Sequence, residues 1–95
     1  MSDSDQESEV IFDEVFDITV ALHYHEQLNE LLNEQKQISL NADKVEKLDG
    51  AGLQLLSAFF IAAEKLNLQI VWTGASETFL KNAEVLGVSE KIGLA

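Results

Sequence analysis

The residues of this sequence that could perform chemistry form two small groups, of which the first is a pair of histidines. His23 and His25 carry imidazole nitrogens, which bind metal ions and transfer protons near neutral pH. Residues two apart on a helix lie about 200° apart around its axis, whereas helical zinc motifs place their histidines four apart. The spacing therefore predicts two solvated side chains on a helix rather than a metal site or a catalytic group.

The second group is the glycine-containing segment 49–52, which reads Asp-Gly-Ala-Gly. Glycine-rich turns before helices can hold phosphate groups on backbone N–H donors. The phosphate-binding frame GxxxxGK[ST] is nevertheless absent, since the next lysine is Lys65, and so is the dinucleotide frame GxGxxG. On local chemistry the segment predicts a tight turn with Asp49 near a helix N-terminus, where its charge is favourable.

The composition excludes most other chemistry. The chain has no cysteine, which rules out thiolate metal sites and cysteine nucleophiles. No serine or threonine lies in a nucleophile-elbow pattern, and no acidic residue lies in an apolar run that would raise its pKa. We therefore predict a protein that is not an enzyme and that uses no cofactor and no metal.

The charge balance narrows the choice of partner. Seventeen Asp and Glu residues against six Lys give a net charge of −11. Nucleic-acid binding requires a basic surface, and an anionic membrane repels the same excess of acids. No apolar run approaches the roughly 18 residues of a membrane span, and the acidic start is unlike a signal peptide. We predict a cytoplasmic protein that binds a protein partner, without nucleic acid and without direct membrane insertion.

The length of 95 residues fits a single domain. Residues 1–9 interleave acids with serine and glutamine and contain no base, which predicts an acidic, disordered tail. Residues 10–95 are then the folded domain.

Hydrophobic periodicity predicts strands that alternate with helices. The strands are predicted at 10–16, with an irregularity at Asp13-Glu14, at 38–42 and at 69–73. The helices are predicted at 19–35, at 51–66 and from the cap Ser76 to Gly87. Residues 43–52 are predicted to be a loop, and 91–95 a final short strand or turn. The third helix is expected to bury Phe79, Leu80, Ala83 and Leu86. This alternation predicts an α/β fold with a small, mixed but mostly parallel sheet of about four strands, packed with about three to four helices. The strand 69–73, whose middle residues Ile70, Val71 and Trp72 are apolar, is expected at the centre of the sheet.

The predicted helix 51–66 has one large apolar residue on its otherwise polar side. Ile61 lies there with Gln54, Ser57 and Ala58, on a ledge that starts at the Gly50 turn. Single exposed apolar side chains are common and by themselves carry little information.

Segment 41–53, Asn-Ala-Asp-Lys-Val-Glu-Lys-Leu-Asp-Gly-Ala-Gly-Leu, resembles the signature of the STAS domain, the fold of bacterial anti-sigma factor antagonists. In that signature a strand and a loop lead to Asp-[Ser/Thr]-[Ser/Ala/Thr]-Gly-Leu, which opens a helix. Phe16-Asp17-Ile18 and the helix ending Leu86-Gly87-Val88 are also similar to segments of the family. The resemblance covers residues 10 to about 93 and implies a STAS-like fold. Only one clear strand precedes the first helix, where the family usually has a two-stranded hairpin.

The resemblance also implies a function. In the family a hydroxyl at the start of the second helix controls partner binding, because phosphorylation adds about −1.5 to −2 charges and breaks the interface. The equivalent positions are Gly50 and Ala51, which cannot be phosphorylated. A constitutively binding regulatory module is therefore implied. Its implied partner-binding residues are Asp49, Gly50, Ala51, Gly52, Gln54, Ser57 and Ile61.

Three partner classes are compatible with this resemblance. The first is a kinase-type anti-sigma factor. The second is a chemotaxis protein, because Asp-Gly-Ala-Gly-Leu-Gln-Leu-Leu is similar to motifs of STAS proteins in chemotaxis clusters. The third is an ABC ATPase, which is the partner of the small STAS subunit of lipid-transport ABC systems. A nucleotide-binding enzyme is the alternative from another functional class, and it would require turnover or tight nucleotide binding.

Overall fold

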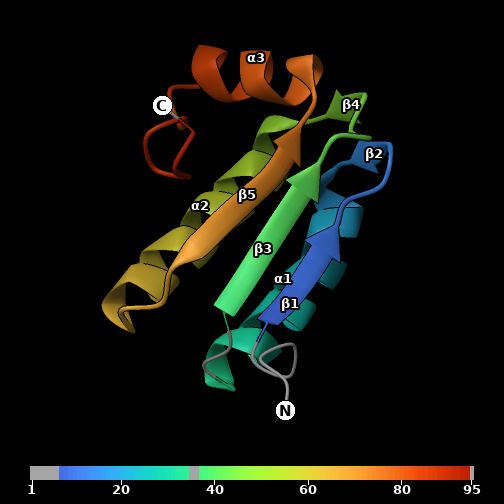
Figure 1. Ribbon diagram of the computed structural model, residues 1–95. Helices are drawn as coiled ribbons and strands as arrows, with labels where there is room; N and C mark the ends of the chain where they lie inside the picture. Colours follow the sequence, from blue (N-terminus) through green and yellow to red (C-terminus); the bar gives the residue numbers. More distant parts are fainter. Residues whose placement is uncertain (1–6, 35–36, 95) are drawn as a thin grey trace.

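The structure is a computed structural model, and it describes residues 7–34 and 37–94 (Figure 1). Its elements in chain order are β1 (Glu7–Ile11), β2 (Val15–Phe16), α1 (Ile18–Asn33), β3 (Gln37–Ala42), β4 (Lys47–Leu48), α2 (Gly50–Lys65), β5 (Ile70–Ala75) and α3 (Glu77–Val85).

The strands form two parallel sheets. The larger has the order β1-β3-β5, and the smaller pairs β2 with β4. The helices α1 and α2 lie side by side on one face of the larger sheet, and α3 lies beyond the end at which β3 and β5 finish (Figure 1). The predicted α/β class, with a small parallel sheet and three helices, is confirmed.

The central strand of the larger sheet is β3 rather than β5. The prediction that 69–73 lies at the centre is wrong, because among the described strands β5 pairs with β3 alone. Its side chains alternate between the two faces of the sheet: Trp72 packs against the core, whereas Val71 is 38% exposed. The apolar composition of this segment therefore belongs to a half-buried edge strand.

The predicted strand 10–16 is divided in two, and the break includes the predicted irregularity at Asp13-Glu14. After β1 the chain bends, and the carbonyl oxygen of Glu14 accepts hydrogen bonds from the N–H groups of Glu46 (2.8 Å) and Lys47 (3.0 Å). These bonds bring β2 alongside β4, which lies inside the predicted loop 43–52. The larger sheet also reaches further towards the N-terminus than expected, since residues 7–9 of the predicted tail belong to β1. Residues 1–6 of that tail lie outside the described residues.

Each helix of the described residues begins with a side-chain cap, at the end of the molecule where the strands of the larger sheet finish. In each, an oxygen of the residue before the helix accepts a hydrogen bond from an N–H of the first turn. The caps are Asp17, Asp49 and Ser76, with distances of 3.1, 2.8 and 3.1 Å. Gly87, at φ 74, follows α3 in the left-handed region, as predicted.

The short helix α3 buries only a narrow face. Phe79 and Ala83 are fully buried, whereas Leu80 and Leu86 are 41% and 44% exposed. The prediction that all four are buried is wrong for the two leucines. A helix of nine residues that packs on the end of the sheet has one face in contact with the core, and Leu80 and Leu86 lie beside that face.

The segment that follows α3 forms turns over residues 89–93 and no strand. It is held to the sheet by Trp72, whose Nε1–H donates to the carbonyl oxygen of Ile92 over 2.6 Å. Ile92 is fully buried, and Trp72 packs against the core.

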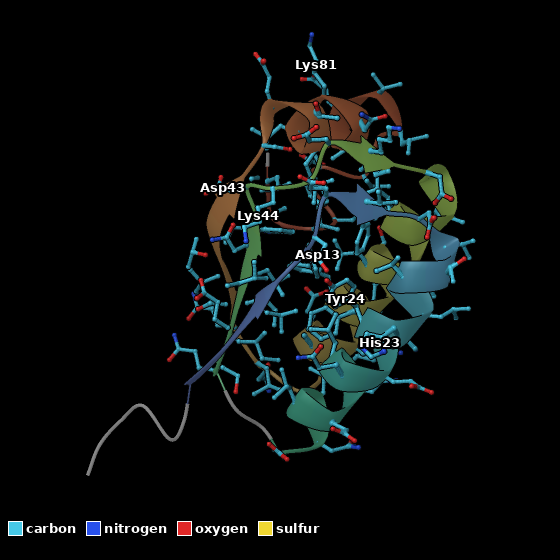
Figure 2. All side chains as sticks on the ribbon, turned by 90° about the vertical axis from the view of Figure 1, so that its right-hand side faces the viewer. Asp13, His23, Tyr24, Asp43, Lys44 and Lys81 are labelled. Atoms are coloured by element: carbon cyan, nitrogen blue, oxygen red, sulfur yellow. The ribbon has the colours of Figure 1, made fainter. Side chains whose placement is uncertain are left out.

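A buried aromatic cluster joins α1 to the sheet. Phe12 is fully buried, with its ring centroid 4.7 Å from that of Phe16 and 4.8 Å from that of Tyr24. The Tyr24 hydroxyl donates to the carbonyl oxygen of Ile11 (3.3 Å) and accepts from the backbone N–H of Asp13 (3.2 Å). Figure 2 shows Tyr24 on α1 beside Asp13. Burial raises the pKa of Tyr24, the Asp13 carboxylate raises it further, and the bond from the Asp13 N–H lowers it.

The pKa of Tyr24 predicts a loss of stability in alkali. A phenol whose folded-state pKa is above its unfolded value of about 10 stabilises the fold fully below that pH, and this contribution disappears as the pH rises through the folded pKa. We expect the free energy of unfolding to fall above about pH 10, and to fall less in Tyr24→Phe. Because Tyr24 is the only tyrosine, alkaline difference absorbance of the folded protein measures its pKa directly. A pKa at or below 10 would contradict the prediction.

Candidate functional site

The segment 49–52 lies at the N-terminus of α2, and Asp49 fixes its position. One carboxylate oxygen, Oδ1, accepts from the N–H of Gly52 (2.8 Å), and the other, Oδ2, accepts from the N–H of Ile18 (3.3 Å). Asp49, which was predicted to lie near a helix N-terminus, therefore caps α2 and also ties it to the start of α1. Because both oxygens bind backbone N–H groups, this carboxylate orients the segment.

Gly50 is the first residue of α2 and has room for a side chain. A Cβ atom built on it would lie 3.6 Å from Cδ1 of Leu86, which is an ordinary van der Waals distance. Ala51, the next residue, is exposed. Gly50 and Ala51 therefore lie at the surface or at its margin, and packing does not require glycine at position 50.

Gly52, in contrast, is a packing residue. It is buried, and a Cβ atom on it would lie 2.9 Å from the carbonyl oxygen of Phe16 and 3.1 Å from Cδ2 of the Phe16 ring. The absence of a side chain lets α2 approach β2 closely. Its expected place on the partner-binding surface is wrong, because β2 covers it.

The predicted exposure of Ser57 is also wrong. It is 5% exposed, and its hydroxyl donates to the carbonyl oxygen of Leu53 in the same helix (3.1 Å). Residues seven apart lie on the same flank of a helix, so Ser57 lies on the flank of Gly50, which faces Leu86. The exposed ledge therefore does not include Ser57.

The remaining ledge residues form a continuous exposed stripe along α2. We call it the α2 stripe, and it consists of Ala51, Gln54, Ala58 and Ile61. These residues lie three or four apart and thus on one face of the helix. Ile61 is 49% exposed, which confirms the prediction that it projects from the polar side.

Two apolar residues at the ends of other helices flank the start of the α2 stripe, and neither was predicted from the sequence to lie there. Ile18 of α1 is 41% exposed, and its N–H binds Asp49. Leu86, which caps α3, is 44% exposed and faces Gly50. Ile18 and Leu86 belong to the segments Phe16-Asp17-Ile18 and Leu86-Gly87-Val88, which were recognised in the sequence. The sequence did not show that both residues lie beside the start of α2, at Asp49 and Gly50. Together with the α2 stripe they form a largely apolar surface that three helices contribute to.

Neither histidine belongs to a metal site in the part of the chain that the structure describes. His25 Nε2 lies 3.2 Å from Nδ2 of Asn29, and His23 is exposed on α1 (Figure 2). In residues 7–34 and 37–94, no three His, Cys, Asp or Glu side chains are grouped so that they could hold a metal ion. None of the helices in those residues combines the length and the apolar composition of a membrane span.

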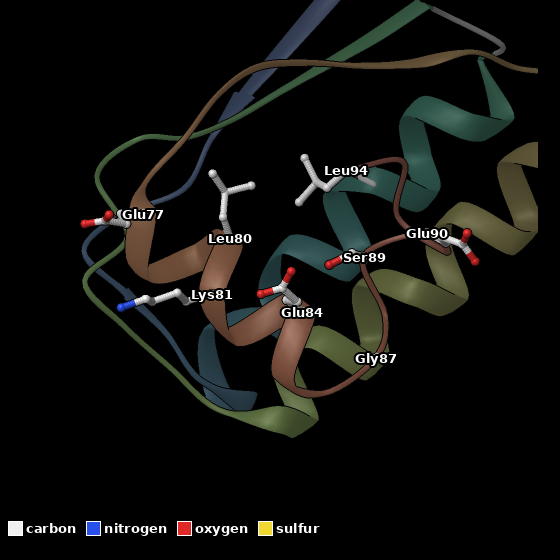
Figure 3. Close-up of a pocket in the computed structure, with 8 residues that line it drawn as sticks. All are labelled: Glu77, Leu80, Lys81, Glu84, Gly87, Ser89, Glu90 and Leu94. Carbon is white, nitrogen blue, oxygen red and sulfur yellow. The ribbon is translucent and has the colours of Figure 1, made fainter.

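An open, acidic depression of about 490 Å³ lies between α3 and the C-terminal turns (Figure 3). Glu77, Glu84 and Glu90 line it together with Lys81. Three carboxylates against one ammonium group repel phosphate, so this hollow does not support the nucleotide-binding alternative.

Comparison with known proteins identifies the family. Neither the curated proteins nor the solved structures contain a significant match to the chain. The protein family described as "Mlab, STAS domain" matches residues 2–94, which is nearly the whole sequence. The resemblance seen in segment 41–53 is thereby confirmed. This chain belongs to the STAS domain family.

Proposed function

We propose that this STAS domain is a non-catalytic regulatory module that binds a protein partner through the α2 stripe and the flanking residues Ile18 and Leu86. The observation that supports the proposal is the exposure of this surface. Ile18, Ile61 and Leu86 are 41–49% exposed, and the small residues Gly50, Ala51 and Ala58 between them let another backbone approach closely. Apolar patches with polar rims are typical of protein interaction sites.

Binding is constitutive in this proposal. Neither Gly50 nor Ala51 has a hydroxyl group to receive a phosphate. The charge that phosphorylation would place beside Leu86 therefore never arises at these positions, and the surface remains compatible with an apolar partner. The net charge of −11 favours a partner whose surface around that patch is basic or mixed.

Three classes of partner remain for the experiment to distinguish. We propose a cytoplasmic partner that is a kinase-type anti-sigma factor, a chemotaxis protein or an ABC ATPase. Affinity purification of the tagged full chain from its own cells, followed by mass spectrometry, identifies which class is retained. Purification of a nucleic acid or of no protein at all would contradict the proposal.

Ala51→Arg should weaken capture of the purified partner at least tenfold. The variant adds bulk and a positive charge in the middle of the proposed contact, while the exposed position leaves the fold intact. Gln27→Arg is the matched control, because Gln27 is exposed on α1 outside this surface. Calorimetry measures the dissociation constant of the partner for wild type and for both variants. Equal affinity of Ala51→Arg and wild type would refute the assignment of the surface.

Calorimetry with ATP and GTP tests the alternative that this protein is a nucleotide-binding enzyme. We expect no heat of binding at millimolar nucleotide, since the N-terminus of α2 lacks the lysine of a phosphate-binding loop. Tight nucleotide binding or nucleotide turnover would contradict the proposal of a non-catalytic module and support a nucleotide-binding enzyme.

A further inference from the structure

A second interaction surface lies at the free edge of β5. Among the described strands nothing pairs with β5 on the side away from β3. Such an edge offers unpaired N–H and C=O groups to another chain, and proteins usually protect it with charged residues or proline. β5 reads Ile-Val-Trp-Thr-Gly-Ala and contains neither. The opposite edge strand, β1, carries the acidic residue Glu9.

An apolar groove of about 410 Å³ begins beside this edge. Ile70 of β5, Phe60 and Ala63 of α2, and Leu68 line it. The ring of Phe60 is stacked on that of Trp72, with centroids 6.0 Å apart and an interplanar angle of 9°. Because side chains of a strand point alternately to the two faces of a sheet, a strand added to β5 would direct every second side chain towards this groove.

The charges around the groove indicate which strand fits. Glu64 and Glu90 also line it, against Lys91. A second copy of this chain would bring its own net charge of −11 to the same edge, so like charges oppose self-pairing. An extended segment with lysine or arginine beside an apolar side chain complements both the charge and the groove.

We propose that the β5 edge binds an extended, basic segment of a partner by strand addition, with one large apolar side chain in the groove beside Ile70. This inference does not rest on the function proposed above. Ile61 lines the groove and also belongs to the α2 stripe, so it does not distinguish the two surfaces. Val71, which lies only at the β5 edge, and Ala51, which lies only in the α2 stripe, do distinguish them.

The test uses the full chain and the peptide acetyl-Lys-Val-Lys-Leu-Lys-Val-Lys-amide. We expect saturable binding below about 1 mM and at least tenfold slower amide hydrogen exchange within residues 70–75. The same peptide with every second backbone amide N-methylated, and the peptide with glutamate in place of lysine, should each bind at least tenfold more weakly. No slowing of exchange in 70–75 at millimolar peptide would overturn the proposal.

Variants of the chain separate this surface from the α2 stripe. Val71→Lys places a positive charge at the β5 edge and should weaken peptide binding at least tenfold. Ile11→Lys makes the same charge change at an exposed residue of β1. This variant and Ala51→Arg should leave peptide binding unchanged. Loss of peptide binding in Ala51→Arg would show that the peptide occupies the α2 stripe. Concentration-dependent dimerisation that protects residues 70–75 would show that the occupant is a second copy; either result refutes the proposal.

Discussion

Gly52→Ala should lower the free energy of unfolding by about 2–3 kcal/mol, as expected for overpacking a buried site. The added Cβ would lie 2.9 Å from the carbonyl oxygen of Phe16. This oxygen cannot move away easily, because it also accepts a hydrogen bond from the N–H of Asp49 (3.3 Å) and because β2 pairs with β4. Urea denaturation followed by circular dichroism measures the effect.

Gly50→Ala provides the matched control two residues earlier in the same helix. Its Cβ meets Leu86 at 3.6 Å, an ordinary contact distance, and alanine restricts the unfolded chain more than glycine does. We expect unchanged or slightly higher stability, by up to about 1 kcal/mol. Equal destabilisation by the two substitutions would show that the N-terminus of α2 does not pack on β2 as described.

Ile61→Asp should reduce partner affinity at least a hundredfold, which corresponds to about 2.7 kcal/mol. Ile61 is the large apolar residue of the α2 stripe, and a partner that covers it would leave a carboxylate desolvated without a counter-charge. Large apolar side chains at the centre of an interface commonly dominate its energy. The dissociation constant for the purified partner, measured by calorimetry, gives the effect.

Ile11→Asp is the control for this substitution. It makes the same chemical change at a residue that is 47% exposed, close to the 49% of Ile61, but on β1. We expect the partner to bind this variant as tightly as wild type. If both variants lost binding equally, the added charge rather than the α2 stripe would be responsible.

The local features of the fold were predictable from the sequence because neighbouring residues determine them. The caps Asp49 and Ser76 and the terminating Gly87 act within one helical turn of their own position. Helical periodicity likewise identified Ile61 as an exposed residue of α2. These features required no knowledge of what packs against each helix.

The errors concern contacts between segments that are distant in the sequence. Gly52 was wrongly assigned to the partner surface. The carbonyl oxygen of Phe16 covers it, and because Phe16 belongs to β2, the sequence around Gly52 does not reveal this contact. Ser57 was expected to be exposed because nothing in α2 itself reveals that this flank of the helix is buried. The order of the strands, which makes β5 an edge strand, also depends on pairing that hydrophobicity alone does not specify.

Thiol labelling of single-cysteine variants tests the role of the α2 stripe most directly, because the chain has no cysteine of its own. Gln54→Cys introduces a thiol in the middle of the stripe, and Gln27→Cys introduces one on exposed α1 outside it. Binding of the partner should slow alkylation at position 54 at least tenfold and leave position 27 unchanged. Alkylation of Cys at position 54 at the same rate in the complex and in the free protein would contradict the account.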